Sequence, residues 1–82
     1  MYEIIFSANA DKQLSKLERA VKERILHALE RVRVRPELYV KKLVGEEGYR
    51  LRVGDYRVIV DIDHGKLVVL VIKIGHRSTI YN

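Results

Sequence analysis

The chain has 82 residues and a formal net charge of +5, so its length corresponds to a single domain over residues 1–82. It contains no cysteine, which excludes a disulfide framework, a thiolate nucleophile and a thiolate metal site. No apolar run approaches the roughly 18 residues of a membrane span, and the first residues do not form a targeting signal. We therefore expect a cytoplasmic protein without membrane contacts, and the positive charge favours a polyanionic partner such as nucleic acid.

The first half of the chain is predicted to be a short strand followed by helix. Residues 2–6 are β-prone, and Ser7 is a suitable N-cap because its hydroxyl can accept a hydrogen bond from the first helical turn. From residue 8 to about residue 34 apolar side chains recur every three or four positions, which predicts one bent helix or a helical hairpin. The apolar positions are Leu14, Leu17, Val21, Ile25, Ala28, Leu29 and Val32.

The second half is predicted to form a sheet. Residues 38–45 are interpreted as a connector after Pro36, and residues 49–53 and 56–63 alternate around the two-residue turn Gly54-Asp55. Residues 67–74 are almost entirely apolar, which is typical of an interior strand covered on both faces. The order β-α-α-β-β-β predicts an α+β domain in which the helices pack on one face of a largely antiparallel sheet.

The hairpin register places arginines together on the face that the helices leave open. If Gly54-Asp55 is the loop, Arg52 pairs with Arg57, and Arg50, Arg52, Arg57 and Asp61 all lie opposite the apolar side. Like charges that face each other across strands destabilise a sheet, whereas a bound phosphate would remove the conflict and suits the guanidinium fork. The alternative interpretation is an arginine pair that extends into water or is bridged by Asp61.

The same register brings residues 75–77 beside this face, so Arg77 is expected near Arg52 and Arg57. Cleavage of RNA by attack of the ribose 2′-hydroxyl on the adjacent phosphorus requires no metal, but it requires stabilised phosphate charge and proton transfer. Arginines can stabilise the phosphate charge, and Tyr81 and His76 are the candidates for proton transfer. Of these two side-chain types, an imidazole is better suited than a phenol to proton transfer at neutral pH. The alternatives are that His76 is a turn residue and Tyr81 a core aromatic.

These motifs resemble the RelE/ParE toxin superfamily, and in particular its RelE-like mRNA interferases. The resemblance covers nearly the whole chain and is strongest at residues 42–45, at residues 49–59, at Gly75-His76-Arg77 and at Ile80-Tyr81. It implies a toxin of a type II toxin–antitoxin system that cleaves mRNA in the ribosomal A site and is inhibited by a cognate RelB-like antitoxin. It also implies the RelE-like fold, which agrees with the fold expected from the pattern.

By motif position, the family's site residues correspond to Arg50, Arg52, Arg57, Arg77 and Tyr81. Typical members carry lysine at the positions of Arg50 and Arg52, and arginine stays protonated and cannot act as a base. The candidate catalytic residues are therefore Arg52, Arg57, Arg77, Tyr81 and His76. The candidate RNA-binding residues are Arg50, Arg52, Lys42 and Lys73.

Two other classes of function are compatible with the sequence. One is a ParE-like inhibitor of DNA gyrase without nuclease activity, because the superfamily fold carries both activities. The other is a catalytically inactive module that binds RNA or antitoxin. The expected partners are the antitoxin, the ribosome and mRNA, with no cofactor, no metal and no small-molecule substrate.

Overall fold

The computed structural model of the protein describes residues 1–79. These residues form a sheet and the helices that cover it. The elements in chain order are β1 (Glu3–Phe6), α1 (Ala8–Ser15), α2 (Arg19–Val34), α3 (Pro36–Tyr39), β2 (Val40–Lys42), β3 (Tyr49–Val53), β4 (Tyr56–Asp63) and β5 (Val68–His76).

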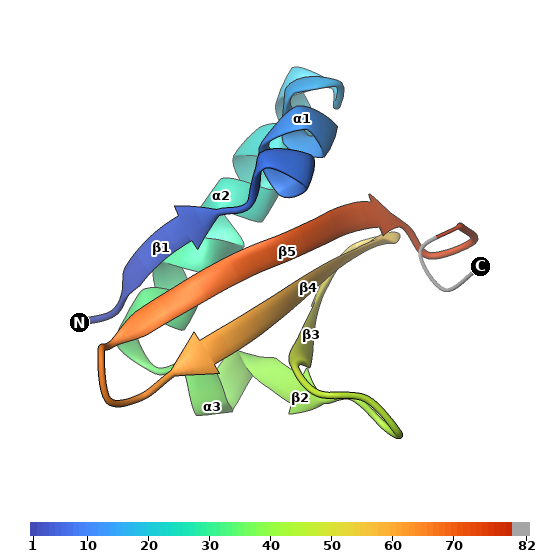
Figure 1. Ribbon diagram of the computed structural model, residues 1–82. Helices are drawn as coiled ribbons and strands as arrows, with labels where there is room; N and C mark the ends of the chain where they lie inside the picture. Colours follow the sequence, from blue (N-terminus) through green and yellow to red (C-terminus); the bar gives the residue numbers. More distant parts are fainter. Residues whose placement is uncertain (80–82) are drawn as a thin grey trace.

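The sheet has the strand order β1-β5-β4-β3-β2. β1 is parallel to β5, and the other neighbours are antiparallel. α1 and α2 lie on the same side of this sheet, and the end of β5 lies beside the β3–β4 hairpin (Figure 1). The predicted α+β class and the interior position of the last strand are therefore confirmed.

Residues 8–34 form a helical hairpin and not one bent helix. α1 ends at Ser15 and α2 begins at Arg19, with three residues between them. Ser7 is the N-cap of α1, because its hydroxyl accepts a hydrogen bond from the Ala10 amide at 3.0 Å. The same hydroxyl donates to the carbonyl oxygen of Ile72 at 2.8 Å, which ties the start of α1 to β5.

The segment after α2 differs from the predicted connector, since it forms α3 and the edge strand β2. Pro36 occupies the first turn of α3, where its missing amide hydrogen costs no helical hydrogen bond. Val40 is then extended, and its strand pairs with β3 so that Val40 lies opposite Leu51 and Lys41 opposite Arg50. The prediction failed here because three residues are too few to show an alternation.

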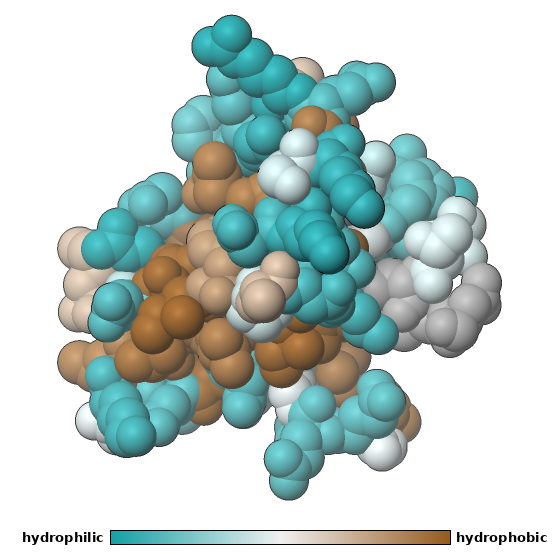
Figure 2. All heavy atoms as spheres, turned by 45° about the horizontal axis from the view of Figure 1, so that its top comes forward, coloured by the Kyte–Doolittle hydropathy of each residue, from teal (hydrophilic) through white to brown (hydrophobic). Residues whose placement is uncertain are grey.

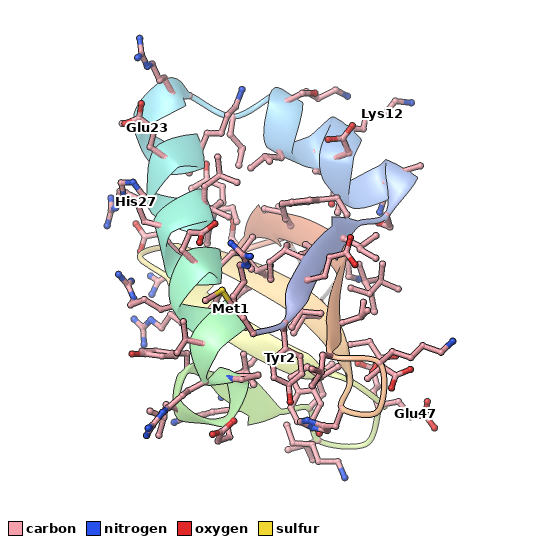
Figure 3. All side chains as sticks on the ribbon, turned by 90° about the vertical axis from the view of Figure 1, so that its left-hand side faces the viewer. Met1, Tyr2, Lys12, Glu23, His27 and Glu47 are labelled. Carbon is pink, nitrogen blue, oxygen red and sulfur yellow. The ribbon has the colours of Figure 1, made fainter. Side chains whose placement is uncertain are left out.

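The core lies between the helices and one face of the sheet. Every apolar position predicted on the helices belongs to it, with Leu17 and Val21 half-buried at its margin. Glu23 and His27 lie on the side of α2 that faces away from the sheet (Figure 3). Within the described residues no helix is both long enough and apolar enough to cross a membrane.

β5 is covered on one face, and not on both as its composition predicts. Val69, Val71 and Ile74 are buried under the helices, whereas Ile72 is 37% exposed on the other side. The register between β4 and β5 shifts at Ile59 and Val60, so that Ile72 is an extra residue in β5. This β-bulge reverses the alternation, and Lys73 therefore lies on the open face beside Ile59.

Candidate nucleic-acid interface

The β3–β4 hairpin has the predicted register. Gly54 adopts a φ of 59°, a left-handed conformation that glycine tolerates in a tight turn, and the two strands meet directly on either side of it. Arg52 pairs with Arg57, Leu51 with Val58, and Val53 with Tyr56. Leu51 and Val58 are buried in the core, so the two arginines lie on the face away from the helices, as predicted.

Basic side chains form two rows across this open face. One row runs over four strands, from Lys41 through Arg50 and Ile59 to Lys73. The other runs from Arg52 through Arg57 to Gly75. We call this surface the basic face, and its charged members are Lys41, Arg50, Arg52, Arg57 and Lys73.

Carboxylates do not neutralise the basic face. Among residues 1–79 the ion pairs are Arg19 with Glu23 and Arg33 with Glu30, both on the helices. Asp61, which was the candidate bridge, uses its carboxylate to accept a hydrogen bond from the Ile62 amide at 3.0 Å. The basic face thus concentrates like charge without internal compensation, which is unfavourable for folding alone and favourable for binding an anion.

A hollow of about 150 Å³ lies in this face, lined by Tyr39, Lys41, Arg50, Arg52 and Arg57. It is smaller than the roughly 300–1,000 Å³ typical of sites that enclose a whole small molecule. An open, basic hollow of this size suits one part of a longer polyanion. We call it the basic hollow.

Sequence reasoning missed Tyr39 and Lys41 as site residues, because both lie in the segment interpreted as a connector. The signal that would have found Lys41 is the pairing of β2 with β3, which places it opposite Arg50. Lys42, one of the two lysines predicted to bind RNA, pairs instead with Tyr49. Lys42 does not line the basic hollow but lines a neighbouring hollow with Arg50 and Glu46, and its role in RNA binding remains a prediction.

The structure brings Arg77 to the hairpin but separates His76 from the arginines. The Arg77 amide donates a hydrogen bond to the carbonyl oxygen of Asp55 at 2.8 Å, directly beside the turn. His76 pairs with Tyr56 and packs edge-on against its ring, with 5.4 Å between the ring centroids. Its Nδ1 accepts from the Ser78 amide at 3.2 Å, so His76 is engaged on the opposite side of β5 from Arg57.

Tyr81 lies outside the described residues, and its position beside the basic face stays a prediction. Within residues 1–79 no three histidine, aspartate or glutamate side chains gather as ligands for a metal ion. Arginine and lysine are the charged groups that line the basic hollow, whereas Asp61 and Asp63 line a separate hollow with Ile5 and Leu70.

The rest of the open face is more apolar. Ile5 is 41% exposed on β1, and Leu70 and Ile72 lie beside it on β5. Figure 2 shows that apolar side chains gather in one area of the face it displays, with hydrophilic side chains around them. The surface therefore combines a basic part and an apolar part.

Comparison with protein families gives a match to the ParE toxin of type II toxin–antitoxin systems over residues 4–81. Comparison with curated protein sequences gives no match. The family match spans nearly the whole chain, including the hairpin and the residues that follow β5.

Solved toxin structures have the same fold. The isolated RelE toxin of E. coli is 31% identical, with a TM-score of 0.81 over 99% of this chain and 92% of that one. The intact RelBE toxin–antitoxin complex of E. coli is 32% identical, with a TM-score of 0.79 over 93% of this chain and 96% of that one. The RelBE2 complex of Mycobacterium tuberculosis is 26% identical, with a TM-score of 0.84 over 93% of this chain and 98% of that one. The protein therefore belongs to the RelE/ParE superfamily and is a toxin of a type II toxin–antitoxin system.

Proposed function

We propose that the protein is a ribosome-dependent endoribonuclease that cuts mRNA in the ribosomal A site and so inhibits translation. The observation that carries the proposal is the basic face, in which Arg52 and Arg57 are directly paired and no carboxylate among residues 1–79 neutralises them. Such a pair is arranged to bind the oxygens of one phosphate. A cytoplasmic location follows from this proposal, because translating ribosomes are the site of action.

In the proposed reaction, the 2′-hydroxyl oxygen attacks the adjacent phosphorus and the bond to the 5′ oxygen of the next nucleotide breaks. Negative charge builds up on the non-bridging phosphate oxygens, and Arg52, Arg57 and Arg77 stabilise it while Arg50 binds the neighbouring backbone. The 2′-hydroxyl loses a proton and the leaving oxygen gains one. The products are a 2′,3′-cyclic phosphate and a free 5′-hydroxyl.

Proton transfer is assigned to Tyr81 in preference to His76. His76 is held against Tyr56 and Ser78 on the side of β5 away from the arginines, whereas Tyr81 follows Arg77 by four residues. Arg50 and Arg52 stand where typical members carry lysine, and they stabilise charge but do not exchange protons.

We further propose a cognate RelB-like antitoxin as the physiological partner, since the RelBE2 and E. coli RelBE structures are toxin–antitoxin complexes. A chain that brings acidic and apolar side chains would match the basic and apolar parts of the open face. Binding there would cover Arg52 and Arg57 and block access of RNA.

The proposal is tested by incubating the purified toxin with translating ribosomes and mapping cuts in the mRNA. Cuts in the A-site codon are expected, together with no effect in a parallel gyrase supercoiling assay, because the basic face is suited to an RNA backbone. Inhibited supercoiling with uncut mRNA would instead favour the gyrase-directed activity that the superfamily also contains.

Replacement of Tyr81 by phenylalanine is expected to lower the cleavage rate on ribosomes by roughly 100- to 10,000-fold, as is typical when a general acid or base is removed. Ribosome binding should persist because the ring remains. The matched control is His76→Phe, which should keep most of the cleavage activity. A slow His76→Phe variant beside an active Tyr81→Phe variant would transfer the proton role to His76.

A further inference from the structure

The basic hollow contains an aromatic side chain that the arginines do not explain. Tyr39 is the last residue of α3, and its side chain lines the hollow with Lys41 and three arginines. The residue is 42% exposed, so its ring is accessible and not part of the core. An exposed ring beside unneutralised cations is the combination with which proteins bind single-stranded nucleic acid.

The ring is also held in place. The guanidinium carbon of Arg31, on α2, lies 5.9 Å from the centroid of the Tyr39 ring, within the range of a cation–π contact. Arg31 does not line the hollow, so this contact comes from a residue outside the hollow. A ring fixed in this way loses little conformational freedom when a flat ligand stacks on it.

Lys41 provides the charge beside this ring. It lies directly opposite Arg50 on the neighbouring strand, in a row two residues along β3 from the Arg52–Arg57 pair. At 3.3–3.4 Å per residue the two rows are about 7 Å apart. The basic face can therefore bind two phosphates of one strand at the same time.

We propose that Tyr39 and Lys41 form a nucleotide subsite, in which a nucleobase stacks on the Tyr39 ring and Lys41 binds the phosphate attached to it. The inference rests on RNA as the substrate proposed above, and it assigns the selection of single-stranded RNA to this subsite. A base can reach the ring only if it is not paired. The subsite thus favours a nucleotide that has left its stack, next to the phosphate bound by Arg52 and Arg57.

The test uses two short, fluorescein-labelled oligonucleotides with 2′-O-methyl groups, which block cleavage. One carries all its bases, and the other has the same number of phosphates but abasic sugars. Binding at low salt is measured by fluorescence anisotropy for the wild type and for Tyr39→Ala, Tyr39→Phe and Leu38→Ala. Leu38 is the matched control, because it precedes Tyr39 on α3, is 62% exposed and does not line the hollow.

Tyr39→Ala is expected to weaken binding of the base-containing oligonucleotide about 5- to 150-fold, the usual effect of losing one stacked base. Tyr39→Phe keeps the ring and should bind like the wild type, as should Leu38→Ala. The abasic oligonucleotide should bind equally to the wild type and to Tyr39→Ala. Lys41→Ala should weaken both oligonucleotides and reduce the slope of log affinity against log salt by about 0.7.

Three results would overturn the subsite: no measurable binding by the wild type, unchanged binding by Tyr39→Ala, or an equal loss with both oligonucleotides. The ribosome assay on the same variants separates this outcome from failure of the proposed function. If the protein discriminates the two oligonucleotides through Tyr39 but leaves mRNA uncut, the subsite is supported and the proposed nuclease activity is contradicted. If the protein cuts mRNA but Tyr39→Ala does not change oligonucleotide binding, the nuclease activity is supported and the subsite is contradicted.

Discussion

Arg57→Ala is expected to lower the cleavage rate on ribosomes by about 100- to 1,000-fold, the usual effect of removing one preorganised donor from a developing oxyanion. Arg57 is the second residue of β4, the central strand of the sheet, and directly faces Arg52, so it is positioned by a strand and not by a loop. Among the described residues, the only hydrogen bond of the Arg57 side chain is donated to the carbonyl oxygen of Tyr56, at 3.3 Å. Its loss should therefore leave folding intact and even relieve repulsion with Arg52.

The matched control is Arg19→Ala, which removes the same side chain and the same charge from another place. The Arg19 side chain is 92% exposed on α2 and pairs with Glu23, an arrangement that contributes little to stability. We expect this variant to cleave like the wild type. Arg57→Lys should fall between the two, because it keeps the charge but loses the two-pronged contact with phosphate. A folded Arg57→Ala variant with full cleavage activity would show that the basic face is not the active site.

The hairpin and its arginines could be predicted because all the information needed is local. Gly54-Asp55 fixes the turn, and strict alternation on both sides of it fixes which residues share a face. The structure reproduces each predicted pair, from Val53 with Tyr56 to Arg50 with Ile59. The helical core positions were equally predictable, because a period of three to four residues persists from residue 14 to residue 32.

Features that depend on distant contacts could not be predicted. β2 has only three residues, and it is a strand because it pairs with β3. Lys41 and Tyr39 were therefore not recognised as neighbours of the arginines. The β-bulge at Ile72 cannot be recognised in a sequence of consecutive apolar residues, because there is no alternation for it to interrupt. It nevertheless places Lys73 on the open face. His76 was expected among the arginines, but its ring packs against Tyr56 on the other side of β5.

The sheet that carries the basic face is stabilised by the core beneath it. Leu29→Ala is expected to cause the largest loss in the free energy of unfolding. Leu29 lies on α2 and is 2% exposed, in contact with the buried side of the sheet. Truncation of a buried leucine lowers the free energy of unfolding by about 2–5 kcal/mol, because the vacated volume is only partly refilled. For 82 residues the total is on the order of 4–12 kcal/mol, so one such change removes a large share of it.

Leu26→Ala is the matched control for this change, since it makes the same truncation one turn earlier on the same helix, where the residue is 39% exposed. Its cost should stay below about 1 kcal/mol, as is usual for surface positions. The Leu29 variant should melt roughly 8–40 °C below the wild type, because a domain of this size loses about 4–8 °C per kcal/mol. Thermal unfolding followed by circular dichroism measures both variants. Equal melting temperatures would mean that α2 does not pack against the sheet through Leu29, and the support for the basic face would have to come from other contacts.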